Sequence, residues 1–360
     1  MAVGPEYAQR RNRAIAGAHD CGAGGLLVTD PTNVRYLTGF TGSNGCLVLG
    51  SDTAVLVTDS RYQEQAAAQC PELEVQIARD SAAGAVRLGM ARNISPLAVE
   101  ANHLTLDRHR GLVEIAGQEL LLETTGVVAE LRRVKDAYEI AQLERAAEII
   151  TLALDDVLHY IAPGVTEQEI ATRLERLVVD HGAEAPAFST IVATGPNSAI
   201  PHHEPTDIRI RSGDLLKIDA GARINGYHSD MTRMFVVGDE PNPHQQELHD
   251  EVLVAADGAA TELAVGVSAQ VPDAVARERL NGLARFFSHG LGHGVGLQIH
   301  EAPMLSSSSA DTIGPGDVLT IEPGVYLPGY GGVRIEDTWL VTAAGSRRLT
   351  MAPRELVRLG

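Results

Sequence analysis

Two aspartates, Asp219 and Asp230, lie on either side of the dipeptide Asn225–Gly226. Asn-Gly is a strong hairpin signal, because a type I′ turn needs φ > 0 at both central residues. With these two residues as the loop, Asp219 faces Thr232, and period-2 alternation puts Asp230 on the same face, one diagonal step away. Diagonal Cα atoms lie about 7–8 Å apart, which lets both carboxylates converge on ions between them. The hairpin alone leaves open an alternative, an exposed sheet face that carries ordinary aspartates.

A second pair of carboxylates follows the same pattern further along the chain. Glu322 ends the apolar run VLTI and Glu336 ends VRI, and a loop centred on Gly329 places the two opposite each other on one face. A charge is expensive to bury in such apolar segments, and like charges on one face are unfavourable without a cation. Two divalent ions would neutralise the four carboxylates. Oxygen-rich ligation suits Mn²⁺, with Co²⁺ or Zn²⁺ as alternatives.

Five histidines lie in two short segments, the glycine-rich run FFSHGLGHGVGLQIHEAP (286–303) and PHHEP (201–205). The first cannot be a zinc-binding helix of the HExxH type, because that motif is absent and the glycines would break a helix. Glycine spacing instead suits a backbone pressed close against a ligand or a metal. The histidines are His202, His203, His289, His293 and His300.

The elements that must position these side chains fall into two parts. The first ~125 residues alternate short apolar runs with helical patterns, which predicts an α/β layer of its own. We expect strands at 26–29, 45–50, 53–59 and 95–100 and helices at 61–69 and 106–117.

In the second part, a 3.6-residue apolar rhythm predicts one long helix from near Ala129 to Pro163–Gly164. Thr166 and Glu169 then form a capping-box pattern that opens another helix, and strands follow as far as Val237. The same order recurs, with helices near 244–264 and 271–281 and strand-like segments at 318–327 and 333–342. This recurrence predicts a pseudo-symmetric α+β domain with helices outside a curved antiparallel sheet. The expected division is 1–126 and 127–360.

Composition narrows the class of protein. The net charge of −18 argues against nucleic acid and anionic membrane surfaces as partners. No secretory h-region is visible, and no stretch approaches ~18 uninterrupted apolar residues. Three cysteines without CxxC spacing, Cys21, Cys46 and Cys70, fit neither a disulfide framework nor a zinc knuckle. We therefore expect a cytoplasmic protein.

The order Asp-x10-Asp, then His in HGLGHGVG, Glu in TIEPG and Glu in VRIED resembles the pita-bread metallopeptidase family, which includes methionine aminopeptidase, aminopeptidase P and proline dipeptidase. ATGPNSAIPHHEP, LQIHEAP, DPTNVRYLTGFTGSNG and TDSRYQEQA resemble its proline-specific branch. ELRRVKDAYEIAQLERAAEI is similar to the helix that joins the N-terminal and catalytic domains in that family. The likeness covers essentially the whole chain and implies a pita-bread catalytic domain preceded by a smaller creatinase/prolidase-like domain.

The resemblance also implies roles. Asp219 would bind one of two ions, His293 and Glu322 the other, and Asp230 and Glu336 would bridge both. Glu322 would also take the proton of a water activated by the ions, which attacks the scissile carbonyl.

The substrate side of the site is implied in the same way. His202 and His300 match histidines that contact substrate and stabilise the tetrahedral intermediate, and His289 matches one that lines the proline pocket. Arg334 shares the strand face of Glu336, so it could pair with a ligand carboxylate besides facing the substrate. Gln298 stands where many relatives carry an acidic residue, His228 is expected to pack, and His203 has no firm assignment.

The reaction expected is hydrolysis of the bond between an N-terminal residue and proline in short peptides. Proline lacks an N–H and restricts the residue before it, so a dedicated site is needed. GFTGSNG resembles aminopeptidase P slightly more than proline dipeptidase, which is the main alternative. A cation that caps the carboxylate of a dipeptide would decide between them. More remote alternatives are methionine aminopeptidase, metal-free creatinase-type C–N hydrolysis and a non-catalytic binding paralogue. The resemblance further implies a homodimer.

Overall fold

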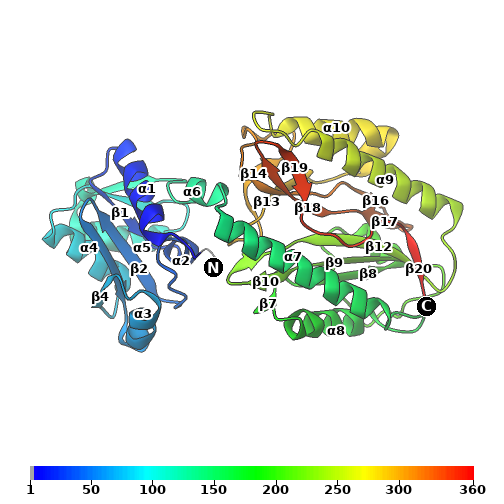
Figure 1. Ribbon diagram of the computed structural model, residues 1–360, viewed down its shortest axis with the longest axis horizontal. Helices are drawn as coiled ribbons and strands as arrows, with labels where there is room; N and C mark the ends of the chain where they lie inside the picture. The colour runs from blue at the N-terminus through cyan, green and yellow to red at the C-terminus, as the bar shows by residue number, and fades with distance from the viewer. Residues whose placement is uncertain (1–3) are drawn as a thin grey trace. The chain divides into compact units, whose positions relative to one another are not determined.

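The computed structural model describes residues 4–360, which form two compact units. The N-terminal unit extends to Arg132, and the C-terminal unit comprises Arg133–Gly360 (Figure 1). Within the described range, no helix combines the length and the apolar character needed to cross a bilayer.

The N-terminal unit is an α/β layer, which confirms the prediction for this part of the chain. Its six-stranded sheet has the order β4-β3-β2-β1-β5-β6, in which β1–β2 and β2–β3 are antiparallel and the other pairs are parallel. The strands are β1 (Gly25–Val28), β2 (Gly45–Gly50), β3 (Thr53–Thr58), β4 (Glu74–Ile77), β5 (Leu97–Glu100) and β6 (Leu121–Thr124). The helices are α1 (Tyr7–Asp20), α2 (Pro31–Thr38), α3 (Gln63–Gln69), α4 (Ser81–Ala91) and α5 (Leu106–Ala116). Sequence patterns missed α1, α2, α4, β4 and β6.

The long helix predicted from Ala129 is wrong as one element, because the chain forms α6 (Ala129–Arg133) and then α7 (Ala137–Leu158). Asp136 interrupts it as the N-cap of α7, and it forms a capping box with Glu139. The backbone N–H of Lys135 leaves the helical ladder and donates to the carbonyl of Gly316 at 3.1 Å. Local capping therefore outweighs the continuous apolar rhythm. The capping box predicted at Thr166 for α8 (Glu167–Asp180) is confirmed.

The C-terminal unit is the predicted pseudo-symmetric pita-bread fold, with mainly antiparallel sheets between two helix pairs; β12 and β20 pair in parallel. In Figure 1, α7 and α8 cover one side of the strands, and α9 (Pro243–Thr261) and α10 (Gln270–Leu280) cover the other. The sheets have the orders β20-β12-β9-β8, β14-β13-β15-β18-β19, β11-β10-β7 and β16-β17. The strands in chain order are β7 (Ala185–Pro186), β8 (Ile191–Thr194), β9 (Leu215–Ala220), β10 (Ala222–Ile224), β11 (Tyr227–His228), β12 (Met231–Val237), β13 (Gly292–Gly294), β14 (Glu301–Leu305), β15 (Val318–Ile321), β16 (Gly324–Leu327), β17 (Gly331–Arg334), β18 (Asp337–Thr342), β19 (Gly345–Arg348) and β20 (Val357–Leu359).

Both predicted hairpin registers are confirmed. Asp219 pairs with Thr232 between β9 and β12, and the turn residues Asn225 and Gly226 have φ values of 47° and 79°. In the second hairpin the pairing of β16 with β17 is centred on Gly329, as expected.

Three of the four predicted carboxylates lie where the chain passes from one sheet to another. The predicted strands 318–327 and 333–342 are each split in two, because Glu322 falls between β15 and β16 and Glu336 between β17 and β18. Asp230 lies in the same way between β11 and β12. At such junctions the direction of a side chain is not set by the alternation of a single sheet. Carboxylates from several strands can therefore converge.

Alternation along β9 separates two hydrophobic clusters. Leu216 and Ile218 join the cluster beneath α7 and α8, whereas Leu215 joins the cluster beneath α9 and α10. Lys217 and Asp219 share the face of Leu215, so both polar side chains lie on the side of β9 that faces away from α7 and α8. Strand β9 thus carries both Lys217 and Asp219 into the interior.

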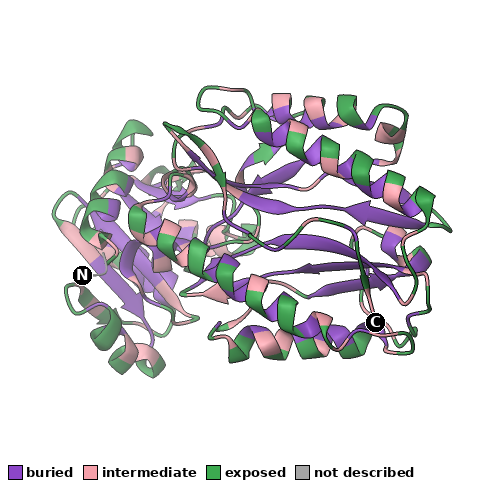
Figure 2. Ribbon diagram, turned by 45° about the vertical axis from the view of Figure 1, so that its right-hand side comes forward, coloured by how far each residue is buried: buried purple, intermediate pink, exposed green. Residues whose placement is uncertain are grey.

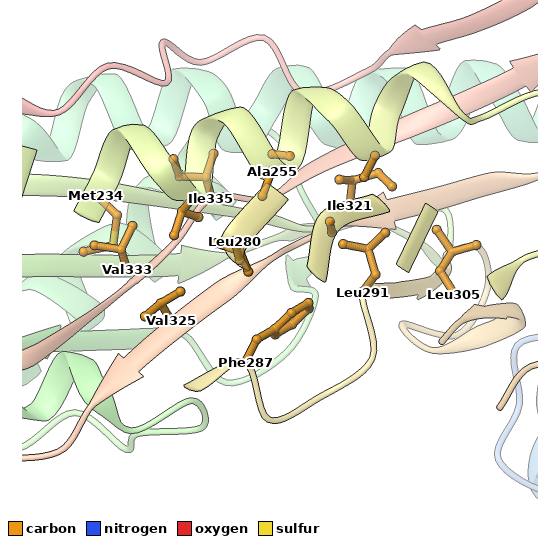
Figure 3. Close-up of a cluster of buried hydrophobic side chains, with 14 of the residues drawn as sticks. Met234, Ala255, Leu280, Phe287, Leu291, Leu305, Ile321, Val325, Val333 and Ile335 are labelled. Atoms are coloured by element: carbon orange, nitrogen blue, oxygen red, sulfur yellow. The ribbon is translucent and has the colours of Figure 1, made fainter. Parts of the chain in front are cut away.

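Burial follows this layering. Figure 2 shows that most strands of the C-terminal unit are buried, while its helices alternate buried and exposed positions; the edge strands β19 and β20 are more exposed. Figure 3 shows part of the cluster beneath α9 and α10, which includes Phe287 together with Ile321, Val325, Val333 and Ile335. Each fully buried side chain of this kind contributes about 1.5–3 kcal/mol. The strand segments that flank Glu322 and Glu336 are therefore held by the core.

The glycines around His293 press against neighbouring strands. A Cβ on Gly292 would lie 2.1 Å from the carbonyl oxygen of Thr320. A Cβ on Gly294 would lie 2.3 Å from that of Ala302. These glycines let β13 fit closely between β14 and β15.

We expect Gly292→Ala to destabilise the C-terminal unit by about 1–3 kcal/mol, because the added methyl meets backbone that cannot move aside. Calorimetric unfolding would measure the change in Tm. Gly282→Ala is the matched control, since a Cβ there meets nothing within 4 Å. Equal melting temperatures for the two variants would contradict the packing argument.

Candidate metal centre

One pocket of the C-terminal unit, with a volume of about 440 Å³, collects every side chain that the sequence singled out as a site residue. The predicted residues that line it are Asp219, Asp230, His293, Glu322, Glu336, His202, His289, His300 and Arg334. His203 and Glu204 also line it, together with apolar side chains that include Phe188, Ile191, Ile299 and Met304. His228 and Gln298 are not among the described lining residues.

The centre of the pocket is a compact set of metal-binding groups. Asp230, His293 and Glu336 each present a ligand atom, and these atoms lie within 4.8 Å of one another. The Nε2 atom of His293 is 3.6 Å from an Asp230 oxygen and 3.4 Å from a Glu322 oxygen. Asp219 stands beside them on β9, and its Oδ1 is buried with no hydrogen-bond partner among the described residues.

The electrostatics of this cluster call for a positive charge. Burial and the neighbouring carboxylates Asp219 and Glu322 raise the pKa of Asp230 well above its usual range. Burial, followed by Asp230 and the other carboxylates, raises the pKa of Glu336 in the same way. Burial raises the pKa of Glu322 to about 8. Keeping these carboxylates ionised therefore costs free energy, which bound divalent cations would offset. The oxygen-rich set of side chains fits such ions.

His293 is prepared to act as a ligand through one specific nitrogen. Its Nδ1 lies 3.0 Å from the carbonyl oxygen of Gly294, so Nδ1 carries the proton and donates. The unprotonated Nε2 then faces the carboxylates. Burial lowers the pKa of His293 to about 4, which keeps the ring neutral and available to a metal.

Arg334 orients this cluster through an ion pair and several hydrogen bonds. Its guanidinium forms an ion pair with Asp219, donates to the Thr232 hydroxyl at 3.0 Å, and donates to the carbonyl of Pro201 at 3.2 Å and to the Tyr326 hydroxyl at 2.9 Å. Thr232 in turn donates to Glu336 at 2.7 Å. The expected pairing of Arg334 with a ligand carboxylate is thus with Asp219.

A second threonine, Thr320, orients Glu322 as Thr232 orients Glu336. The Thr320 hydroxyl donates to Glu322 at 3.2 Å and accepts the backbone N–H of His293 at 3.0 Å. Both Thr232 and Thr320 are fully buried. Each therefore aims a glutamate at the centre of the pocket.

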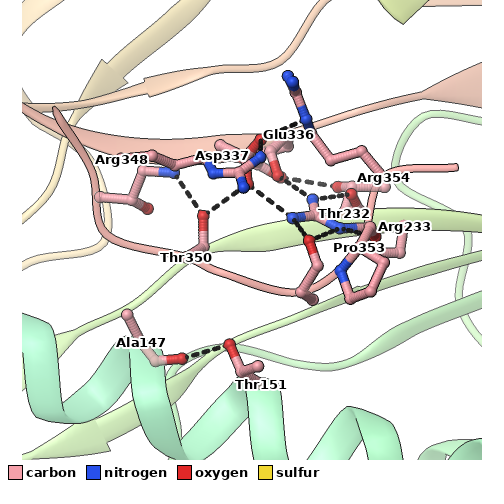
Figure 4. A network of polar contacts seen from close by, with 12 residues as sticks. Ala147, Thr151, Thr232, Arg233, Glu336, Asp337, Arg348, Thr350, Pro353 and Arg354 are labelled. Carbon is pink, nitrogen blue, oxygen red and sulfur yellow. Dashed lines mark hydrogen bonds and ion pairs between the residues drawn. The ribbon is translucent and has the colours of Figure 1, made fainter.

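A buried ion pair supports Glu336 from behind (Figure 4). Arg233 donates to Asp337 at 2.6 Å and to the backbone carbonyl of Glu336 at 2.6 Å. The Thr350 hydroxyl donates to the same Asp337 at 2.7 Å. Because these groups are buried and hydrogen-bonded on all sides, they fix the β17–β18 junction at which Glu336 stands.

A chain of hydrogen bonds runs from Arg334 to His289. The Tyr326 hydroxyl accepts from Arg334, so its own proton goes to Nε2 of His289 at 2.8 Å. Nδ1 of His289 lies 2.8 Å from the carbonyl of Gly290 and donates to it. Burial lowers the pKa of His289 to about 4, which keeps the ring neutral. Both nitrogens are engaged, so His289 presents its ring surface to the pocket.

His202 and His300 differ from the buried histidines because both are exposed. The ring centroid of His300 lies 4.4 Å from that of His293, and burial lowers the pKa of His300. His228 contacts the carbonyl of Gly296 through Nδ1 at 3.0 Å, as a packing residue would. His202 and His300 are thus exposed histidines that line the pocket.

Several residues of the centre escaped the reasoning from sequence. Thr232 and Thr320 stand two positions from Asp230 and Glu322, and Lys217 stands two positions from Asp219, so period-2 spacing from each carboxylate could have found them. No local signal marks Tyr326, since its partners come from other strands.

Comparisons with known proteins agree with this geometry. The model of metallopeptidase family M24 matches residues 141–343, and that of the creatinase/prolidase N-terminal domain matches residues 10–134. A Xaa-Pro dipeptidase of Pyrococcus furiosus is 37% identical over 343 residues, which are 92% of this chain and 94% of that protein.

Solved structures of similar proteins span nearly the full length. A Xaa-Pro dipeptidase from Bacillus anthracis superposes with a TM-score of 0.94 at 34% identity, over 98% of this chain and 100% of that one. An X-Pro aminopeptidase from Thermotoga maritima gives a TM-score of 0.88 at 33% identity, over 96% and 100%. Family membership implies divalent metal ions, for which the pocket supplies fitting ligands. The chain therefore belongs to metallopeptidase family M24 and is a metal-dependent hydrolase with a creatinase/prolidase-type N-terminal domain.

Proposed function

We propose that this protein hydrolyses the peptide bond between an N-terminal residue and proline, and that it accepts peptides longer than two residues. The observation that carries the proposal is a pocket in which a buried carboxylate–histidine cluster adjoins the ring of His289 and apolar side chains. Relatives named Xaa-Pro dipeptidase and X-Pro aminopeptidase support the choice of bond.

The residues that would hold two divalent ions here are Asp219, Asp230, His293, Glu322 and Glu336; the resemblance implies that Asp230 and Glu336 would be shared between the ions. The unpartnered oxygen of Asp219 and the free Nε2 of His293 support this assignment. Mn²⁺ suits the oxygen-rich set, and Co²⁺ or Zn²⁺ are the alternatives. When bound, such ions supply Lewis acidity and make water a nucleophile near neutral pH.

The side chains of this protein provide the proton transfers. Glu322 stands at the cluster with its orientation set by Thr320, and it accepts the proton of the attacking water. It then delivers that proton to the proline nitrogen, which leaves as a secondary amine. His202 and His300, exposed at the pocket, donate to the developing oxyanion of the scissile carbonyl.

His289 contributes shape to the proline subsite. Its nitrogens are occupied by Tyr326 and the carbonyl of Gly290, so the ring offers an apolar wall and no hydrogen bond. A proline side chain, which is apolar and compact, suits such a wall. This arrangement supports proline as the residue after the scissile bond.

The choice between aminopeptidase and dipeptidase depends on charge. A site restricted to dipeptides needs a cation for the free carboxylate of the substrate. Among the described residues that line the pocket, Arg334 is the one lysine or arginine, and Asp219, Thr232, Pro201 and Tyr326 occupy it. Glu204 adds an exposed carboxylate to the pocket. These charges favour a Xaa-Pro aminopeptidase, and a Xaa-Pro dipeptidase is the second candidate.

Purified protein supplied with Mn²⁺ should cleave Ala-Pro-Ala with a higher kcat/KM than Ala-Pro, and it should leave Ala-Ala-Ala intact. Stopped assays of released alanine would measure all three rates. Cleavage of Ala-Pro alone would establish the dipeptidase, and no cleavage of either proline peptide would refute the proposed function.

Asp230→Asn should reduce kcat by roughly 10³-fold or more, because an amide cannot bridge two cations and several kcal/mol of charge stabilisation are lost. Elemental analysis should show less bound metal per chain. Asp155→Asn, on the exposed face of α7, is the control and should retain both activity and metal. Near-normal turnover of Asp230→Asn would disprove the bridging role.

Glu204→Gln should raise kcat/KM for Ala-Pro about two- to fivefold, since one exposed like charge costs up to about 1 kcal/mol. The rate for Ala-Pro-amide, which lacks the carboxylate, should stay the same. Glu355→Gln, an exposed glutamate that does not line the pocket, serves as the control. An equal effect on both substrates would rule out charge selection by Glu204.

A further inference from the structure

The segment that carries His202 is fastened to the fold by a buried carboxylate outside the pocket lining. This segment, residues 194–206, joins β8 to the chain before β9, and we call it the histidine loop. Glu167, at the first position of α8, is completely buried beside it. Its Oε1 accepts the N–H of Thr194 at 2.8 Å and the side-chain amide of Asn197 at 3.0 Å, at the start of the loop.

The second oxygen of Glu167 holds the end of the same loop. Oε2 accepts Nε2–H of His203 at 2.8 Å, the N–H of Thr206 at 3.0 Å and the Thr206 hydroxyl at 2.7 Å. Burial opposes ionisation of Glu167, yet the hydrogen bonds from Asn197, His203, Thr206 and Thr194 together lower its pKa. One carboxylate therefore ties both ends of the histidine loop.

Lys217 holds the middle of the loop through backbone carbonyls. Its Nζ donates to Ser198 at 3.2 Å, to Ile200 at 2.7 Å and to Pro201 at 3.2 Å. Burial lowers the pKa of Lys217 to about 6; the ammonium form can donate all three of these hydrogen bonds, and the neutral amine can donate two of them. Lys217 is itself completely buried on β9, two residues from Asp219.

These contacts converge on the peptide group that precedes His202. The carbonyl of Pro201 accepts from both Lys217 and Arg334, and Arg334 also holds Asp219. On the other side of His202, the ring of His203 is bound to Glu167. His202 is thus an exposed ring between two anchored neighbours, and its backbone is tied to the arginine that orients a carboxylate of the centre.

We propose that Glu167 and Lys217 are positioning residues that hold His202 at the reaction centre by clamping the two ends and the middle of the histidine loop. The proposal rests on the proposed function insofar as His202 acts on substrate. A side chain displaced by about 1 Å can lose up to roughly 10²-fold in rate, so such a clamp bears directly on turnover.

The first test needs no activity. Hydrogen–deuterium exchange of the whole protein should be faster at backbone amides of residues 194–206 in Glu167→Gln, because an amide replaces one of the two accepting oxygens. Glu139→Gln is the matched control. It changes another buried glutamate in the first turn of a helix, whose partners Asp136 and Tyr227 lie outside the loop. Unchanged exchange of the loop in Glu167→Gln would overturn the clamp.

The second test is a double-mutant cycle on hydrolysis of Ala-Pro-Ala. Glu167→Gln should lower kcat about tenfold or more with a smaller change in KM. The further loss should nearly vanish when His202 is already alanine, because the two residues act through one position. Losses that multiply independently of His202 would mean a general structural role and would overturn the proposal, whereas Glu139→Gln should keep the wild-type kcat.

Lys217→Met provides a second variant if Glu167→Gln does not fold, and it should give the same faster exchange and the same dependence on His202. An inactive wild-type protein would refute the proposed function alone, because the exchange experiment still decides whether the clamp exists. If a folded Lys217→Met protein exchanges the loop amides as slowly as the wild-type protein, then Lys217 is not part of the clamp.

Discussion

The repulsion among four carboxylates in one buried pocket is the interaction around which the C-terminal unit is organised. Asp230 and Glu336 are almost completely buried, and burial together with their neighbours raises the pKa of each. A protein keeps such a cluster only where bound cations offset its cost. The sheets, junctions and polar supports of this unit can be understood as means of holding these side chains close together.

Three of the four carboxylates are each oriented by a buried side-chain donor. Arg334 binds Asp219, Thr232 donates to Glu336, and Thr320 donates to Glu322. Because Asp230, Glu322 and Glu336 stand at junctions between sheets, their backbones need separate fastening. The Arg233–Asp337 pair provides it behind Glu336.

Arg334 also supports the part of the pocket that contains His202 and His289. Arg334 links the cluster through Tyr326 to His289 and through Pro201 to the loop of His202. One guanidinium thereby connects Asp219 with His289 and with the loop that carries His202. Since these contacts engage Arg334, little positive charge remains in the described pocket lining for a substrate carboxylate, and this supports our proposal that the substrates are longer than dipeptides.

The sequence by itself determined the features that depend on local pattern. Hairpin parity placed Asp219 opposite Thr232, and even spacing centred the second hairpin on Gly329, because side-chain period and turn chemistry are local. Where a local signal competed with a longer one, prediction failed, as when the Asp136 cap divided the helix expected from Ala129. Only the tertiary structure decided the rest. Thr232 meets Glu336 and Arg334 meets Asp219 across more than 100 residues of chain, and although spacing marks the face on which each residue lies, it does not identify a partner on a distant strand.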